Sequence, residues 1–142
     1  MCRNLARKSG QRVVAYDLGP EPLTSLAADG VEGARSPIEV VERADVVFLS
    51  LPGDKEVRNV CLADDGLLFA MRVGQTLVDM STATVTLARE LGRIFEVKGV
   101  DYADAPVART AQAARDGTLS IMVGGEAPVF ARLRPLLACM AT

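Results

Sequence analysis

The fold is decided by SPIEVVERADVVFLSLP, which occupies residues 36–52. Ser36 is a typical helix N-cap, Pro37 suits the first helical position, and Glu39 stands where a capping box needs an acid. The apolar run at residues 46–51 predicts the strongest strand of the chain, and a proline ends it. A helix that leads directly into a buried strand is typical of an α/β protein.

The same alternation continues on both sides of this stretch. Apolar strand patterns are expected at residues 12–17, 31–35, 76–80, 100–103 and 119–123. Helical patterns are expected at residues 1–9, 21–28, 54–61, 84–97 and 126–140, the last with a break or kink near Pro135. Strands that alternate with helices predict a doubly wound, Rossmann-type α/β fold with a mostly parallel sheet, and 142 residues fit one domain spanning residues 1–142.

The composition excludes several function classes. A net charge of −2 without clustered basic residues argues against nucleic acid as a partner. No apolar run approaches the roughly 20 residues that cross a bilayer, so no membrane partner is expected and the cytoplasm is the expected location. The absence of histidine excludes a Ser-His-Asp triad, and three scattered cysteines without a C-x-x-C pair predict neither a metal site nor a disulfide framework.

Asp17 is the first candidate for binding. It ends the expected strand at residues 12–17, where doubly wound domains hold the adenosine ribose hydroxyls of a dinucleotide. A carboxylate at this place accepts hydrogen bonds from both hydroxyls and repels a 2′-phosphate, and the next three residues include no arginine. The residues therefore favour NAD over NADP. The alternative is a turn-forming aspartate before Gly19 and Pro20.

Two further strand ends carry candidates, Leu51-Pro52 and Ser81-Thr82. In open α/β sheets the ligand lies across the carboxyl ends of the strands, where backbone groups of the first pair and hydroxyls of the second could contact it. Ser81 and Thr82 are equally typical helix N-caps, so both interpretations stay open.

The third candidate region is the long connection at residues 104–117. A loop that leaves one strand end and returns as another strand is a favourable place for a substrate. Arg109 could fork around a carboxylate, because the planar guanidinium offers donors to both oxygens. A solvated surface arginine is the alternative interpretation.

Residues 104–125, DAPVARTAQAARDGTLSIMVGG, closely resemble the DAPVSGG…GTL-x-IMVGG signature of the β-hydroxyacid dehydrogenases. The stretch at 36–52 and VDMSTATV at 78–85 match further motifs of that family, and MCRNLARKSG at the start resembles its first helix. The family includes enzymes of the 3-hydroxyisobutyrate dehydrogenase and tartronate semialdehyde reductase types, with 6-phosphogluconate dehydrogenase more distant. The resemblance covers essentially the whole chain.

The resemblance implies an oxidoreductase that transfers a hydride between NAD, or NADP, and a small 3-hydroxy acid or its semialdehyde. It implies that Asp17 binds the adenosine ribose and that Leu51 and Pro52 contact the cofactor through their backbone. Thr82 would approach the nicotinamide ribose or ring. Ala108-Arg109-Thr110 would face the substrate, and here the family usually has Ser-Gly-Gly. This departure leaves the identity of the acid open.

The family also has parts that the sequence does not contain. No G-x-G-x-x-G run, the loop that holds the pyrophosphate, occurs in it, so that loop and the family's first strand are expected before Met1. Without this central strand, two strand edges would face a gap in the sheet. The catalytic lysine and a helical domain are expected beyond Thr142. None of Lys8, Lys55 and Lys98 belongs to the expected motif, so no catalytic residue is assigned.

These expectations leave two interpretations of function. In the first, the chain is the cofactor-binding part of a dehydrogenase that is a homo-oligomer at full length, and the fragment alone is inactive. In the second, it is a non-catalytic Rossmann-like remnant that serves as a binding or oligomerisation module. A different Rossmann binder such as a methyltransferase fits the motif at 104–125 poorly.

Overall fold

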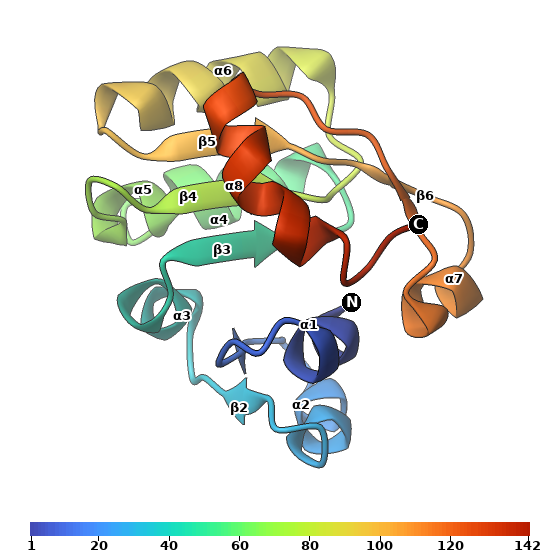
Figure 1. Cartoon of the computed structure of the whole chain (residues 1–142). Coiled ribbons are helices and arrows are strands. Elements are labelled where there is room, and N and C mark those ends of the chain that lie inside the picture. Colours follow the sequence, from blue (N-terminus) through green and yellow to red (C-terminus); the bar gives the residue numbers. More distant parts are fainter.

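A computed structural model describes residues 1–142 and shows an α/β fold built on a parallel sheet (Figure 1). Strands β3 (Val46–Leu49), β4 (Thr76–Asp79) and β5 (Asp101–Asp104) are hydrogen-bonded in that order, and all three run parallel. Helix α6 (Val85–Val97) connects β4 to β5. The doubly wound α/β architecture expected from the sequence is confirmed.

β4 is the centre of this sheet, and all four of its residues are buried. On one face, side chains of β3 and β4 pack against helices α3 (Pro37–Arg43), α4 (Asp54–Leu62), α5 (Leu67–Ala70) and α6. The buried residues of this face are Val41, Val47, Leu49, Val57, Cys61, Leu67, Met71, Leu77, Leu87, Leu91, Phe95 and Val100. The strand side chains alternate between faces, so Leu77 belongs here and Val78 to the opposite face.

The opposite face is covered by α1 (Cys2–Lys8) and α8 (Ala127–Leu137). Its buried residues are Leu5, Val78, Met80, Ala103, Ala105, Val129, Leu133, Leu137, Cys139 and Met140. α8 runs through Pro135 and ends two residues later, so the expected helix end at Met140 is wrong by one turn. Beyond Leu137 the chain forms i→i−3 bonds, from the Cys139 N–H to Leu136 O at 3.1 Å and from the Met140 N–H to Leu137 O at 2.9 Å, so the last turn tightens and the α-helix ends.

The sheet is divided between β1 and β3. β1 (Val14–Ala15) pairs only with β2 (Glu32–Gly33), in parallel, and β3 pairs only with β4. α2 (Pro20–Ala27) connects β1 to β2, and Figure 1 shows β2 and α2 apart from the sheet of β3 to β5. The two short strands replace the longer ones expected at 12–17 and 31–35, because each has only one neighbouring strand to bond with.

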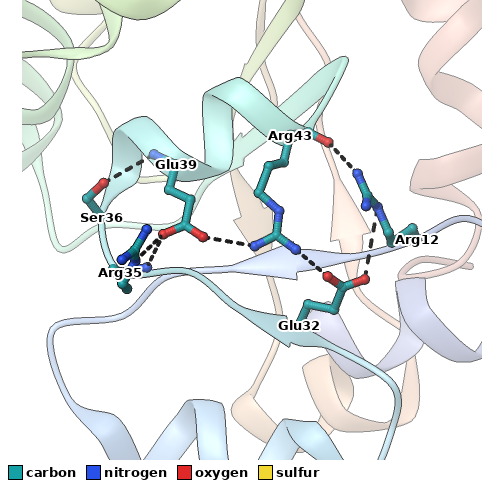
Figure 2. Close-up of polar contacts among 6 residues, drawn as sticks. All are labelled: Arg12, Glu32, Arg35, Ser36, Glu39 and Arg43. Carbon is teal, nitrogen blue, oxygen red and sulfur yellow. Dashed lines mark hydrogen bonds and ion pairs between the residues drawn. The ribbon is translucent and has the colours of Figure 1, made fainter.

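A chain of alternating charges ties this small sheet to α3 (Figure 2). Glu32 of β2 pairs with Arg43 in the last turn of α3, and Arg43 also pairs with Glu39 at 3.0 Å. Arg12 lies 4.0 Å from Glu32, and Arg35 lies 3.1 Å from Glu39, so the two arginines extend the chain at its ends. Exposed pairs contribute only about 0–1 kcal/mol each, so this network links the small sheet to α3 but adds little to the stability of the fold.

The start of α3 confirms the cap expected from the sequence. The Glu39 N–H donates to Ser36 Oγ at 3.1 Å. The Glu39 carboxylate in turn accepts from the backbone N–H of Arg35 at 3.0 Å, one residue before the position that a standard capping box uses. None of the helices is both long and apolar enough to cross a membrane.

The connection at residues 104–117 is not the open loop expected from the sequence. It contains β6 (Val107–Ala108) and α7 (Ala111–Asp116). β7 (Ser120–Ile121) pairs with β6 in antiparallel fashion, so the expected strand at 119–123 is shorter and does not join the parallel sheet. An antiparallel bridge between Asp104 and Gly124 attaches this hairpin to the end of β5.

Candidate functional site

The carboxyl ends of the three central strands form one edge. The register aligns Leu49 with Asp79 and Asp79 with Asp104. Leu51 and Thr82 therefore leave the sheet at the same edge, as expected for a ligand that crosses the strand ends. The connection to β6 also starts here, because the Ala105 N–H donates to Asp79 O at 2.7 Å.

Ser81 joins the loops that follow β3 and β4. The Leu51 N–H donates to Ser81 Oγ at 3.0 Å, and the Ser81 N–H donates to Asp79 Oδ1 at 2.9 Å. Ser81 and Asp79 are both buried. The N-cap of α6 is Thr84, whose side chain accepts from the Leu87 N–H, so the interpretation of Ser81 or Thr82 as the cap is wrong.

Thr82 and Pro52 are exposed beside this link, and Leu51 is half-buried. The Thr82 hydroxyl makes no hydrogen bond within the chain, so it is free to bond a ligand. The Ser81 link was not foreseen as part of the site. A hydrogen bond between two loops 30 residues apart depends on strand register, and the only signal for it in the sequence is a small hydroxyl residue at a strand end.

A buried polar group lies under this edge. Asp79 Oδ2 and the Tyr102 hydroxyl are both buried without a hydrogen-bond partner. Burial raises the pKa of the Cys61 thiol to about 12, with the Asp79 carboxylate as the second cause. Burial and the same carboxylate also raise the pKa of Tyr102 and of Asp104. Cys61 is therefore a neutral thiol at pH 7, which excludes it as a nucleophile.

Asp17 lies two residues after β1 and is exposed. Its Oδ1 accepts from the Gly19 N–H at 2.9 Å, so it does form the turn of the alternative interpretation. Its second oxygen makes no hydrogen bond within the chain and can accept from a ligand. The turn and the ligand-binding role are therefore compatible.

Arg35 reaches the same end of the small sheet as Asp17. The Ala34 N–H donates to Ala15 O at 2.8 Å, so Arg35 follows β2 beside the residues that follow β1. The Arg35 side chain is 93% exposed and pairs with Glu39. Inspection of the residues adjacent to Asp17 in sequence missed this arginine, because only strand pairing brings it to this edge.

Ala108, the last residue of β6, is exposed, and so are Arg109 and Thr110, which lie between β6 and α7. Arg109 has a φ of 86°, the left-handed region that favours glycine. Its Nη1 donates to Thr118 O at 3.0 Å, which closes the segment from Arg109 to Thr118. The Thr110 hydroxyl caps α7 by accepting from the Ala113 N–H at 3.2 Å. No hydrogen bond or ion pair joins these three residues to Asp17 or to the loops after β3 and β4.

The architecture is that of a dinucleotide-binding domain, and comparison with known proteins agrees. Residues 1–142 match a family model described as the NAD binding domain of 6-phosphogluconate dehydrogenase. The chain belongs to this family. Members of the 6-phosphogluconate dehydrogenase NAD-binding domain family bind NAD(P), and the expectations of a Rossmann-type fold and a nicotinamide cofactor are confirmed.

Individual relatives fit this family. 3-Hydroxyisobutyrate dehydrogenase of Pseudomonas aeruginosa is 41% identical over 140 residues, which are 99% of this chain and 47% of that protein. The Mycobacterium tuberculosis 3-hydroxyisobutyrate dehydrogenase, solved with L-serine, has a TM-score of 0.87 at 37% identity over 98% of this chain and 48% of its own. Psf3, solved with NADP+ and 2-OPP, has a TM-score of 0.92 at 30% identity, and the match covers 99% of this chain and 49% of Psf3. The chain thus spans about half the length of these relatives.

The residues of the NAD-binding domain fit part of the cofactor. Asp17 and Thr82 present an oxygen each that no group of the chain uses, and both suit ribose hydroxyls. The pyrophosphate is different. Its usual partner is a glycine-rich loop, and the only adjacent glycines of the sequence, Gly124 and Gly125, follow the β6–β7 hairpin.

Proposed function

We propose that this chain is the cofactor side of a dehydrogenase that transfers a hydride between NAD and the hydroxyl-bearing carbon of a small 3-hydroxy acid. The Leu51–Ser81 hydrogen bond carries the proposal, because it brings the backbone of Leu51 and the hydroxyl of Thr82 to one edge of the sheet. The relationship to 3-hydroxyisobutyrate dehydrogenases supports the substrate class.

In this proposal each edge residue has one role. Asp17 accepts hydrogen bonds from the adenosine ribose hydroxyls through its free oxygen. Leu51 and Pro52 lie against the cofactor through their backbone, and Thr82 bonds the nicotinamide ribose or approaches the ring. The nicotinamide, when bound, accepts or supplies the hydride. The protein contributes orientation of the cofactor at this edge.

The preference for NAD over NADP follows from the charges at the end of the small sheet. The Asp17 carboxylate repels a 2′-phosphate. Arg35 is the one arginine placed where it could bind a 2′-phosphate, but its guanidinium is paired with Glu39. Both observations support NAD. The NADP bound to Psf3 shows that the same fold also accepts the other cofactor.

We further propose that Ala108, Arg109 and Thr110 face the substrate and that Arg109 pairs with its carboxylate. Arg109 is exposed and uses only its Nη1 within the chain, so Nε and Nη2 remain as donors. Among the lysines, Lys98 already donates to the carbonyls of Leu68 and Phe69. None of the three lysines belongs to the family's lysine motif, so we assign no catalytic acid or base within these 142 residues.

The setting of the whole enzyme is also part of the proposal. Cys2, Cys61 and Cys139 are free thiols, which fits the cytoplasm as a reducing compartment. The active protein is proposed to be a homo-oligomer.

A chimera tests this function. In it, residues 1–142 replace the matching residues of the Pseudomonas aeruginosa 3-hydroxyisobutyrate dehydrogenase, which is 41% identical over that region. We expect NAD-dependent oxidation of 3-hydroxyisobutyrate, with a higher kcat/KM for NAD than for NADP. A folded chimera that binds neither cofactor would contradict the proposal and favour a non-catalytic module. The isolated 142 residues should bind NAD weakly, with a Kd in the millimolar range, where the binding free energy is about −4 kcal/mol.

A further inference from the structure

Asn4 joins two helices that lie far apart in the sequence. The residue is 5% exposed, and its Nδ2 donates to Ala114 O at 2.9 Å and to Arg115 O at 3.1 Å. Both carbonyls belong to the last turn of α7, where a helix leaves its carbonyl groups without intrahelical partners. The Asn4 amide of α1 therefore supplies a donor to two of these carbonyls.

Gly117 gives Asn4 the space for this contact. Gly117 ends α7 with a φ of 70°, a conformation that favours glycine. A Cβ at Gly117 would lie 3.2 Å from Asn4 Cγ and 2.6 Å from Lys8 Nζ. Both the backbone conformation and the close approach require glycine. The end of α7 is thus fitted to the side chains of α1.

α7 depends on such anchors because it is short. A helix of six residues is not stable by itself in water. Its first turn is held by the Thr110 cap, and Arg109 closes the segment onto Thr118 O. These two contacts are local to the segment. The Asn4 amide is the buried side chain that joins the segment to α1, and the Met1 ammonium adds a longer contact of 3.5 Å to Ala114 O.

We propose that Asn4 is a positioning residue for the substrate. By holding α7, it fixes Ala108, Arg109 and Thr110 relative to α1 and the rest of the domain. The inference rests on the proposed function, in which residues 108–110 face the substrate. The hydrogen-bond partners of Asn4 lie in α7 and include none of Asp17, Leu51 and Thr82. Loss of the Asn4 amide should therefore weaken binding of the hydroxy acid and leave binding of NAD unchanged.

Amide hydrogen exchange of the 142-residue chain tests the structural half of this inference. The amides of Ala114 and Thr118 bond to carbonyls within the α7 segment. In Asn4→Ala, loss of two neutral hydrogen bonds should make these amides exchange at least about tenfold faster, while the amides of α6 are unchanged. Asn4→Leu, which keeps the volume but has no donor, should give the same result. Asn59→Ala, at an exposed position on α4, is the matched control. Unchanged exchange at Ala114 and Thr118 in both Asn4 variants would overturn the inference.

Steady-state kinetics of the chimera test the functional half. We expect Asn4→Ala to raise the KM for 3-hydroxyisobutyrate by about tenfold, the loss expected when a positioned group becomes mobile, with the KM for NAD unchanged. Equal losses for acid and cofactor would indicate a general structural role and overturn the inference. If the unsubstituted chimera has no turnover, the proposed function is contradicted, and the hydrogen-exchange result alone decides whether Asn4 positions α7.

Discussion

The backbone N–H of Leu51 donates to the side-chain oxygen of Ser81 at 3.0 Å, which joins the loops after β3 and β4 at the proposed cofactor edge. Ser81 is itself held by Asp79, whose Oδ1 accepts the Ser81 N–H. Through these two hydrogen bonds, Ser81 fixes the loop after β3 relative to the end of β4. A single buried side chain therefore links the two segments that we propose contact the cofactor.

Ser81→Ala should destabilise the domain by about 1–2 kcal/mol, because the half-buried Leu51 N–H loses its partner. In the chimera the same change should raise the KM for NAD. Ser50→Ala, at an exposed neighbouring position, is the control and should change neither quantity. Chemical denaturation and steady-state kinetics measure the two effects. A wild-type unfolding midpoint in Ser81→Ala would show that the link does not hold the loops.

Asp17→Ala should reduce the preference of the chimera for NAD over NADP, because the carboxylate that repels the 2′-phosphate is removed. Asp17→Ala combined with Glu39→Gln should reduce it further, since Arg35 is then released from its partner. The ratio of kcat/KM values for the two cofactors measures both changes. A higher efficiency with NADP in the unsubstituted chimera would refute the cofactor assignment.

Arg109→Ala should raise the KM for the hydroxy acid by about 10- to 150-fold, because a charged hydrogen bond contributes roughly 1.5–3 kcal/mol. Arg109→Lys should restore only part of the loss, since an ammonium cannot form the bidentate contact. Arg115→Ala, on the exposed last turn of α7, is the matched control. Unchanged kinetics in Arg109→Ala would support the alternative interpretation, in which Arg109 is a solvated surface arginine.

Arg109→Gly separates the substrate contact from backbone strain. Glycine adopts a φ of 86° readily, so this variant should be more stable than Arg109→Ala by about 1 kcal/mol. Both variants lack the guanidinium and should show the same high KM. Chemical denaturation of the two variants side by side gives the difference. Equal stabilities would mean that the segment relaxes away from the left-handed conformation.

The acid stability of the domain should depend on Asp29. Hydrogen bonds and charge from Arg3 and Arg7 hold the pKa of this carboxyl below its usual value. A pKa that is lower in the folded state stabilises the fold above the unfolded pKa of about 4, and this contribution is lost as the pH falls through the folded value. The melting temperature should therefore decrease as the pH is lowered below about 4, and the decrease should be smaller in Asp29→Asn. Glu42→Gln on the exposed face of α3 is the control. An identical pH profile in Asp29→Asn would exclude this ion pair as the cause.

The central strands and the cap of α3 could be predicted from the sequence because their signals are local. An apolar run at residues 46–51 predicts β3, and Ser36 with Glu39 predicts the helix start, without knowledge of any distant residue. The sheet order also agrees with the expected division, since β1 and β3 are not paired.

The parts that could not be predicted depend on distant contacts. β6 has two residues and α7 has six, too few for a periodic pattern, and α7 is anchored by Asn4 from the other end of the chain. The Ser81 link requires the parallel register of β3 and β4. The place of Arg35 near Asp17 likewise follows from the pairing of β1 with β2. The residues of each pair are far apart in the sequence and come close together only in the fold.

Amide chemical-shift mapping of NAD on the isotope-labelled 142-residue chain tests the central claim most directly. It needs neither turnover nor tight binding, and it reports each residue separately. We expect shifts at Asp17, Leu51 and Thr82 that grow over millimolar NAD, with no shifts in α5, which precedes the opposite end of β4. Shifts confined to that opposite end, or none at these three amides at saturating NAD, would contradict the proposal that the carboxyl edge binds the cofactor.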